Sequence, residues 1–510
     1  MQHPKKNEMN GEKNTFSASL KENEEKIVQY LGESKDVQLT HFQIKLSKNK
    51  QVAALLLVID GLVDEEAKRN NILKPLIEPP FEEMEVVNLK QIQSRIAVKE
   101  VRIESNFEEA INYVLKSKAL LMVEGFSKGL LIAIEGFEIR TISQPETEQT
   151  VRGSREGFIE SLDVNLSLIR RRITNPSLRF ETLTIGDFNS TNVTVAYIKE
   201  IADPTLVKRV IERLKNIKVD SIHNSGDIEQ FIEDHPYSIF STIGNTERPD
   251  FVANLLMEGR IIILIDGDPT SLFVPILFVE NIKHIEDYHS RPYYSSFIRL
   301  IRFFAFFISI TLPALYISAI NFNKALIPSD MIVPVTIARE SVPFPLALEV
   351  IIMILMFEVV REAGVRLPKQ IGTAISIVGP LILGDVAVTS SLVGAPTVII
   401  VSISYIASFV ITPIADVTAL IRIAIFIPAS IFGSYGLVIA MLALLTHMIS
   451  LTSLGVPFMA PFSPMYFSDW KDSIIRLPTR LLKYRKQSIP TQRKRKINSL
   501  PNIPNMEEKK

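Results

Sequence analysis

Cysteine is absent from the 510 residues, tryptophan occurs once, and 56 Lys and Arg balance 56 Asp and Glu. Without cysteine the chain has no disulfide framework, no thiolate metal ligand and no cysteine nucleophile. A net charge of zero argues against a protein that binds nucleic acid through bulk positive charge. The sequence has no Walker or dinucleotide glycine motif, and its seven histidines lack metal-site spacing. We therefore expect no metal, no cofactor and no enzymatic activity.

Charge is also nearly missing from one long part of the chain. Residues 303–470 hold 14 charged side chains in 168, about 8%, against about 29% in the rest of the sequence. About 20 consecutive apolar residues are enough to span a bilayer. The composition therefore predicts a soluble N-terminal region followed by a membrane region.

One pattern occurs twice in the soluble region. Leu55–Asp64 and Thr194–Asp203 are strand-like runs that end in an Asp at a predicted helix start. Farther on, Leu120–Gly125 and Ile262–Gly267 each combine a buried strand, an acidic residue and a turn glycine. Both matches are separated by about 140 residues and keep the same order. We therefore predict two related α/β subdomains, although short apolar strands also resemble each other by chance.

The expected fold class is an α/β cytosolic region of two related subdomains followed by an α-helical polytopic membrane domain. The N-terminus lacks the apolar core of a signal peptide, so we expect the first 300 residues in the cytosol. The predicted parts are a disordered lead-in (1–25), a first subdomain (26–145), a linker (146–157), a second subdomain (158–290), a membrane domain of four to six helical segments (298–452) and a basic cytosolic tail (471–510).

The apolar stretches and the basic residues between them predict a topology. The stretches are 303–320, 342–360, 371–394, 395–413 and 417–451. The last is long enough for two passes broken around FGSYG, or for a re-entrant hairpin. Residues 471–510 carry twelve Lys or Arg against three acidic residues, which is typical of a cytosolic segment. We expect both termini in the cytosol, with six spans or four spans plus re-entrant segments.

Three carboxylates fall inside these stretches: Glu349, Glu358 and Asp385. An ionised side chain at mid-bilayer costs about 2.5–3.5 kcal/mol on insertion scales, so it normally faces protein or water. Glu349 and Asp385 are therefore candidates for a pore wall, or they pair with arginine. For Glu358 we favour an ion pair at the membrane interface. The arginines available for pairing are Arg361, Arg366 and Arg422.

The stretch 371–394 is rich in glycine, alanine and serine. Small residues let helices approach closely, whereas hydroxyl groups can line a wet path. Tight helix packing and pore lining both explain this composition. The pore-lining candidates are Glu349, Ser376, Gly379, Gly384, Asp385, Ser390 and Ser391.

A run of four basic residues lies near the C-terminus. Near a membrane surface each would gain about 1 kcal/mol from anionic lipid. The run either contacts lipid in this way or acts only as a topology signal. Its residues are Arg493, Lys494, Arg495 and Lys496.

Four segments of the sequence resemble the A subunit of the GerA-type spore germinant receptors. They are EGFIESLDVNLSLIRRRI (156–173), SGDIEQFIEDHPYSIF followed by ERPD (225–250), VPFP (342–345) and EVVREAGVRLPKQIG (358–372). The segments occur in the family's order, and the resemblance extends from about residue 40 to residue 470.

The resemblance implies a protein of the spore inner membrane with a transporter-like B subunit and a lipoprotein C subunit as partners. It also implies a homo-oligomer that conducts ions once the B subunit senses a nutrient, and thereby triggers germination. Two alternatives stay open: a non-conducting membrane scaffold of the receptor, and a paralogous channel that amplifies germination.

Overall fold

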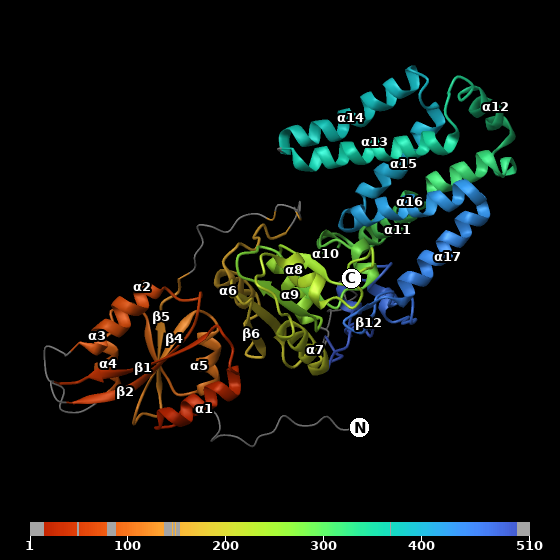
Figure 1. Ribbon diagram of the computed structural model, residues 1–510. Coiled ribbons are helices and arrows are strands. Elements are labelled where there is room, and N and C mark those ends of the chain that lie inside the picture. The colour runs from red at the N-terminus through yellow and green to blue at the C-terminus, as the bar shows by residue number, and fades with distance from the viewer. Residues whose placement is uncertain are drawn as a thin grey trace, which may run out of the picture. The chain divides into compact units, whose positions relative to one another are not determined.

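The computed structural model describes residues 15–47, 50–78, 88–136, 145, 148, 153–367 and 369–496 (Figure 1). The chain forms two compact units. Of the described residues, the α/β unit comprises those within 15–236, 243–275 and 484–496, and the helical unit comprises those within 237–242 and 276–483.

The α/β unit contains two five-stranded antiparallel sheets with the same strand order. In spatial order, the first sheet is β1 (Val37–Lys45), β2 (Gln51–Ile59), β4 (Lys118–Val123), β5 (Gly129–Ala133) and β3 (Val101–Glu104). The second is β6 (Leu178–Ile185), β7 (Thr191–Ile198), β9 (Ile261–Ile265), β10 (Ser271–Val274) and β8 (Gly244–Thr246). The matched runs are β2 with β7 and β4 with β9, which occupy equivalent positions. The prediction of two related α/β subdomains is confirmed.

Helices cover both faces of the first sheet (Figure 1). They are α1 (Leu20–Leu31), α2 (Glu65–Ala67), the π-helical turn η1 (Lys68–Leu73), α3 (Lys74–Ile77), α4 (Leu89–Arg95) and α5 (Phe107–Val114). Because successive side chains of a strand point to opposite faces, Leu55 and Leu57 pack with α1 and α5, while Leu56 and Val58 pack with η1, α3 and α4. Burial on both faces explains why β2 is apolar without alternation.

The structure differs from the expected lead-in at residues 1–25, because α1 begins at Leu20. Leu20, Ile27 and Leu31 are buried against the first sheet. The Asn23 side chain also donates to the Ser17 carbonyl at 2.7 Å. Because this segment contains many charged residues, its composition does not indicate an apolar helix face. The face is identified by its packing against the first sheet.

The second subdomain has four helices: α6 (Leu162–Arg172), α7 (Pro204–Lys215), α8 (Ser225–Ile232) and α9 (Pro249–Met257). The predicted Asp residues at helix starts are confirmed in both subdomains. Asp64 Oδ1 accepts a hydrogen bond from the Ala67 N–H (2.9 Å), and Asp203 Oδ1 accepts one from the Thr205 N–H (2.8 Å). Such caps satisfy amides that have no partner within the helix.

A buried ion pair joins the two subdomains. Arg170 of α6 donates through Nε to Asp36 Oδ2 (2.6 Å) and through Nη2 to Asp36 Oδ1 (3.0 Å). Asp36 lies directly before β1, and both side chains are almost completely buried. The two parallel hydrogen bonds therefore fix the start of the first sheet to the first helix of the second subdomain.

The helical unit contains α10 (Glu286–His289), α11 (Pro292–Asn321), α12 (Ser329–Ile337), α13 (Leu346–Arg366), α14 (Lys369–Thr389), α15 (Ala395–Phe409), α16 (Ala415–Phe432) and α17 (Ser434–Ser450). Its short elements are β11 (Thr452–Ser453), β12 (Val456–Pro457) and the 3-10 turns η2 (Phe278–Ile282), η3 (Lys324–Leu326), η4 (Thr412–Ile414), η5 (Asp469–Asp472) and η6 (Thr479–Leu481). Among the described residues, α11 and α16 are long and apolar enough to cross a bilayer, and α15 and α17 are shorter apolar helices. Gly433 separates α16 from α17 within FGSYG.

Replacing Asp36 with Ala leaves the Arg170 guanidinium buried without its charge partner. We expect the free energy of unfolding of the α/β unit to fall by about 3–5 kcal/mol. Asp163→Ala is the matched control, because the Lys35–Asp163 pair also joins the subdomains but is solvent-exposed and contributes at most about 1 kcal/mol. Urea unfolding of the full chain in detergent, followed by pulse proteolysis, measures both values. Equal losses in the two variants would contradict this assignment.

A partly buried carboxylate in the linker predicts a pH effect. Glu148 accepts hydrogen bonds from the Thr246 hydroxyl (2.5 Å) and the Glu247 N–H (3.2 Å), and burial raises its pKa. Because the folded state holds this proton more tightly, ionised Glu148 lowers stability at neutral pH, and the loss disappears as pH falls through the raised pKa. We expect Glu148→Gln to raise the unfolding midpoint at pH 7 and to leave it unchanged below about pH 4. A pH-independent effect would contradict the burial argument.

Candidate functional site in the helical unit

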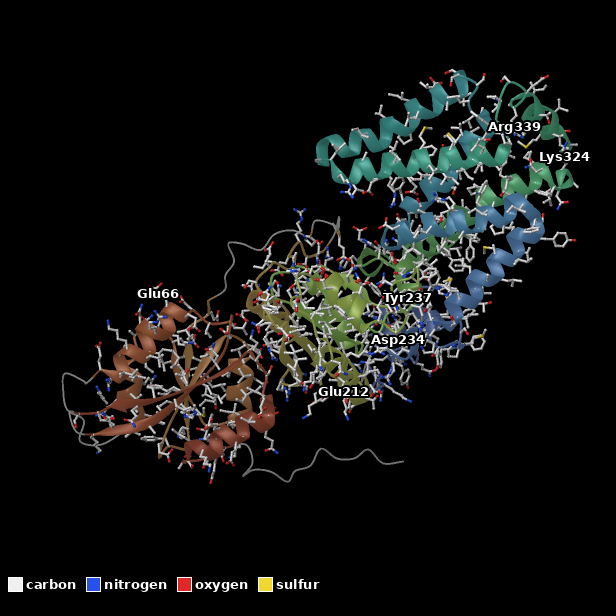
Figure 2. All side chains as sticks on the ribbon, viewed as in Figure 1. Glu66, Glu212, Asp234, Tyr237, Lys324 and Arg339 are labelled. Carbon is white, nitrogen blue, oxygen red and sulfur yellow. The ribbon has the colours of Figure 1, made fainter. Side chains whose placement is uncertain are left out.

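Glu349 lies in the first turn of α13 and is fully buried. Its Oε1 accepts hydrogen bonds from Arg339 Nη2 (2.9 Å) and Nε (3.3 Å). Its Oε2 accepts from the Gly394 N–H (3.1 Å) and the Thr397 hydroxyl (3.0 Å). Arg339, labelled in Figure 2, follows α12, so one carboxylate connects three separate parts of the helical unit. Its partner is an arginine of the loop rather than one of the three arginines that the sequence suggests.

The local sequence explains this arrangement. Pro345 is extended and starts α13, which places Glu349 in the first helical turn. A Cβ atom at Gly394 would lie 2.8 Å from Arg339 Cγ, so glycine leaves the space that the arginine needs. The free N–H groups at the start of α15 favour a negative charge, and Glu349 supplies it.

Asp385 has the opposite environment. It is exposed on α14, and Leu381, Ile382 and Val386 around it are exposed as well. It also lines a groove of about 650 Å³ between α13, α14 and α15, together with Gly384. Within the part of the chain that the structure describes, no ion pair or hydrogen bond reaches the Asp385 carboxylate. This single carboxylate therefore interrupts an apolar surface.

The small residues of α14 divide into two groups. A Cβ atom at Gly379 would lie 3.1 Å from Val360 of α13, and one at Gly384 would lie 3.2 Å from Val398 of α15. Both glycines therefore allow close helix packing, which is the alternative to pore lining. Ser390 and Ser391 lie at the end of α14, where the Ser390 hydroxyl donates to the Val386 carbonyl (2.5 Å). The Ser376 side chain lies outside the described residues.

Glu358 and Arg361 form an ion pair on α13, with 2.8 Å between Arg361 Nε and Glu358 Oε2. Arg422 of α16 approaches Glu358 as well, at 3.5 Å. Arg366 does not join them, because its Nε pairs with Glu362 at 2.6 Å. The structure thus brings Glu358 and Arg361 together with Arg422, which the sequence also offers as a partner, and leaves Arg366 out.

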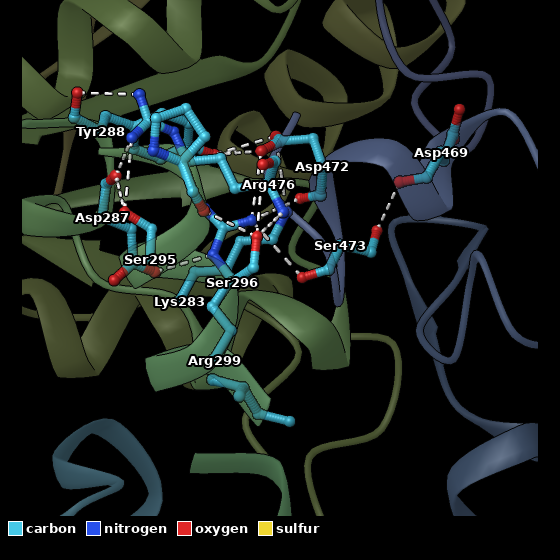
Figure 3. Close-up of polar contacts among 12 residues, drawn as sticks. Lys283, Asp287, Tyr288, Ser295, Ser296, Arg299, Asp469, Asp472, Ser473 and Arg476 are labelled. Carbon is cyan, nitrogen blue, oxygen red and sulfur yellow. Dashed lines mark hydrogen bonds and ion pairs between the residues drawn. The ribbon is translucent and has the colours of Figure 1, made fainter. Parts of the chain in front are cut away.

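A second ionic cluster lies where α11 begins, and Figure 3 shows its contacts. Two carboxylates, Asp287 and Asp472, meet three cations there. The shortest pairs are Arg299 Nε–Asp287 Oδ2 (2.8 Å), Arg302 Nη1–Asp287 Oδ1 (2.9 Å), Arg299 Nη1–Asp472 Oδ1 (3.2 Å) and Lys283 Nζ–Asp472 Oδ2 (3.7 Å). Arg299 is almost fully buried between the two acids. The cluster therefore attaches the segment after α17 to the first turns of α11.

This cluster is missing from the sequence-based candidates. Asp287 and Asp472 lie outside the apolar stretches, so their positions in the sequence do not predict that they are buried. The sequence feature that could have indicated the cluster is the pair Arg299 and Arg302, three residues apart at the start of an apolar helix. If these two cations are buried, they require carboxylates nearby. Among the described residues, no group of three or more His, Asp or Glu side chains has the geometry to hold a metal ion.

Replacing Glu349 with Ala removes the partner of Arg339 and leaves the Gly394 N–H unpaired. We expect a loss of about 3–5 kcal/mol in the stability of the helical unit. Glu362→Ala is the matched control on the same helix, because its pair with Arg366 is exposed and worth at most about 1 kcal/mol. Thermal unfolding of both variants in the same detergent measures the difference. A loss no larger than that of the control would show that Glu349 does not hold the three segments together.

The chain is similar to known proteins over most of its length. The family model described as Bacillus/Clostridium GerA spore germination protein matches residues 25–488. Spore germination protein KA of Bacillus subtilis (strain 168) is 38% identical over 470 residues, which cover 91% of this chain and 85% of that protein. The uncharacterized membrane protein YfkQ of the same strain is 37% identical over 465 residues, or 91% of this chain and 90% of that protein.

A solved structure also shows similarity to this chain. The crystal structure of the N-terminal domain of the A subunit of the Bacillus megaterium spore germinant receptor GerK3 is 34% identical, with a TM-score of 0.41. It covers 52% of this chain and 97% of that domain. Because the family model matches most of the sequence and the relatives exceed 30% identity over most of their length, the chain belongs to the GerA family of spore germination proteins.

Proposed function

We propose that the chain is the A subunit of a nutrient germinant receptor in the spore inner membrane. It crosses the membrane several times and keeps both termini in the cytosol. Family membership supports the receptor role, and the apolar helices α11 and α16 support insertion in a bilayer. The basic segment after α17 supports the orientation, since Lys and Arg gather on the cytosolic side.

We further propose that several copies assemble and conduct ions, with α14 at the path. The exposed Asp385 carries this proposal, because an ionised carboxylate avoids lipid and must face water or protein. An oligomer that turns this side of α14 inward would place a ring of carboxylates around a lumen, and such rings favour cations. In this mechanism a transporter-like B subunit senses the nutrient, a lipoprotein C subunit completes the receptor, and this chain opens in response.

A non-conducting scaffold is the second candidate, and a specific observation favours it. Glu349 and Glu358 are both paired within one chain, and Gly379 and Gly384 serve close helix packing. Three of the seven pore-lining candidates, Glu349, Gly379 and Gly384, thus have roles inside a single subunit. A scaffold would assemble in the membrane and recruit partners while the membrane stays ion-tight.

Ion flux through liposomes containing the full chain, with its receptor partners and nutrient, separates the two functions. We expect cation-selective flux, and we expect Asp385→Asn to reduce the preference for cations over anions by about fivefold, since a charge about 4 Å from the ion contributes about 1 kcal/mol in water. Asp330→Asn is the matched control, because Asp330 is an exposed acid on α12, away from the groove.

The possible outcomes are distinct. Ion-tight liposomes with an assembled receptor would favour the scaffold. Flux whose selectivity is the same in Asp385→Asn as in the unchanged protein would remove Asp385 from the path. A loss of selectivity in Asp330→Asn of equal size would show that surface charge in general, rather than this position, controls the flux.

A further inference from the structure

The segment 484–496, here called the C-terminal strap, belongs to the α/β unit although it follows the helical unit in sequence. It folds back on itself, because the Arg485 N–H donates to the Lys494 carbonyl (2.8 Å) and Tyr484 forms an antiparallel bridge with Arg495. Its side chains are partly enclosed, with Ser488 and Ile489 buried. The strap is thus a folded element with its own contacts.

The strap meets the second subdomain through backbone hydrogen bonds. Thr491 forms an antiparallel bridge with Ala202, and the Gln492 N–H donates to the Ile201 carbonyl (2.9 Å). The Gln492 side chain adds two bonds, to the carbonyls of Lys199 (3.1 Å) and Ala202 (2.7 Å). Three bonds from one residue define the register of the strap on the turn between β7 and α7.

Arg485 makes a second anchor. Its Nε donates to the Met257 carbonyl (2.7 Å) at the end of α9, and its Nη1 donates to the carbonyls of Arg493 and Arg495 (both 2.9 Å). The last carbonyls of a helix have no partner within the helix, and a cation is favoured there. Arg485 therefore closes the folded strap and attaches it to α9 at the same time.

Gly259 leaves the space in which the strap sits. It follows α9 in the left-handed region, with φ +93°, and a Cβ atom there would lie 2.4 Å from Thr491 Cγ2. Gly267 has nearly the same backbone conformation, with φ +87°, but a Cβ atom there would meet nothing within 4 Å. Replacing either glycine with alanine would strain the backbone to a similar extent. Only at position 259 would the new Cβ atom also collide with the strap.

Acidic residues of the second subdomain face the basic residues of the strap. Lys486 and Lys496 approach Glu258 at 3.4 Å and 3.8 Å, and Arg493 approaches Glu200 at 3.7 Å. Two of the four basic residues that were candidates for lipid contact or for a topology signal, Arg493 and Lys496, therefore lie near acidic residues of the protein. Lys486 is largely enclosed, whereas Arg493 and Lys496 are exposed, so their long ion pairs are weak and are screened by salt.

We propose that the surface around Gly259, Ile201 and Glu258 is a docking site for this chain's own C-terminal strap, and that the strap is releasable. The chain leaves the second subdomain after β10, at Pro275, and returns at Tyr484. A docked strap therefore holds the chain to the same subdomain before and after the helical unit in sequence. This inference is independent of whether the chain conducts ions.

Hydrogen exchange of the full chain in detergent, read by mass spectrometry, tests the docking. We expect the Gln492 amide, which donates to the Ile201 carbonyl, to be protected, and we expect Gly259→Ala to speed its exchange by about tenfold or more because of the collision with Thr491. Gly267→Ala should leave the strap unchanged, and adding Thr491→Ser to Gly259→Ala should restore protection by removing the methyl group. Gln492→Ala, at an exposed position, should also release the strap without unfolding the chain.

Several results would overturn the proposal. They are an unprotected Gln492 amide in the unchanged chain, equal effects of Gly259→Ala and Gly267→Ala, and no loss of protection in Gln492→Ala. Raising the salt from about 0.05 M to about 0.5 M should speed exchange in the strap, since the Debye length falls below about 5 Å. Exchange that does not respond to salt would overturn the releasable part.

A cross-link identifies the occupant of the docking site. The chain has no cysteine, so Ala202→Cys with Thr491→Cys introduces a single pair, and residues opposite each other in an antiparallel bridge are close enough for a disulfide. We expect a disulfide within one chain, found in the digested protein without a covalent dimer on a non-reducing gel. A covalent dimer would show that the strap of a neighbouring copy docks here, and no disulfide would show an empty site; both contradict the proposal.

Discussion

Buried arginines are the constraint on which the rest of this structure depends. A guanidinium carries five N–H donors and a permanent charge, so its burial requires carboxylates and carbonyls around it. The side chains that are largest among those with under 2% exposure are Arg170, Arg248, Arg260, Arg299 and Arg422. Arg170 meets Asp36 across the two subdomains, and Arg248 binds the carbonyls of Glu148 and Ser154 in the linker. Because these bonds are directional, they determine how distant segments meet.

The need of a buried arginine for a carboxylate partner also distinguishes the acids in the apolar stretches of the helical unit. Glu349 and Glu358 are satisfied by arginines inside one chain, and their removal would leave cations unpaired. Asp385 has no such partner among the described residues and lies on an apolar surface. Two of the three acids in the apolar stretches therefore hold the subunit together, and the third remains for water, an ion or a second subunit. This division is what connects the fold to the proposed conduction.

Sequence reasoning succeeded where local order carries the signal and failed where a partner had to be chosen. Strand-like apolar runs followed by an Asp at a helix start revealed the repeat of two subdomains. Arg366 was expected near Glu358, but eight residues of helix separate the two by about 12 Å, whereas Glu362 is one turn away. Arg339 is absent from the partners that the sequence suggests for Glu349. It lies in the loop after α12, and the path of that loop is not predictable from the sequence. For the basic run 493–496 the sequence leaves lipid contact and a topology signal both open, and it does not reveal the acidic residues near Arg493 and Lys496, which are far away in sequence.

The amino-acid sequence by itself determined the division into a charge-rich and an apolar part, the duplicated subdomain and the starts of α2 and α7. These features depend on periodicity and on capping residues within a few positions of each other. Tertiary structure alone decided which charges meet: Arg170 and Asp36 are 134 residues apart, and Arg299 and Asp472 are 173 apart. Any acid in the chain is a possible partner for a given arginine until packing brings two segments together and excludes water. Charge pairing at that range is therefore a result of the fold.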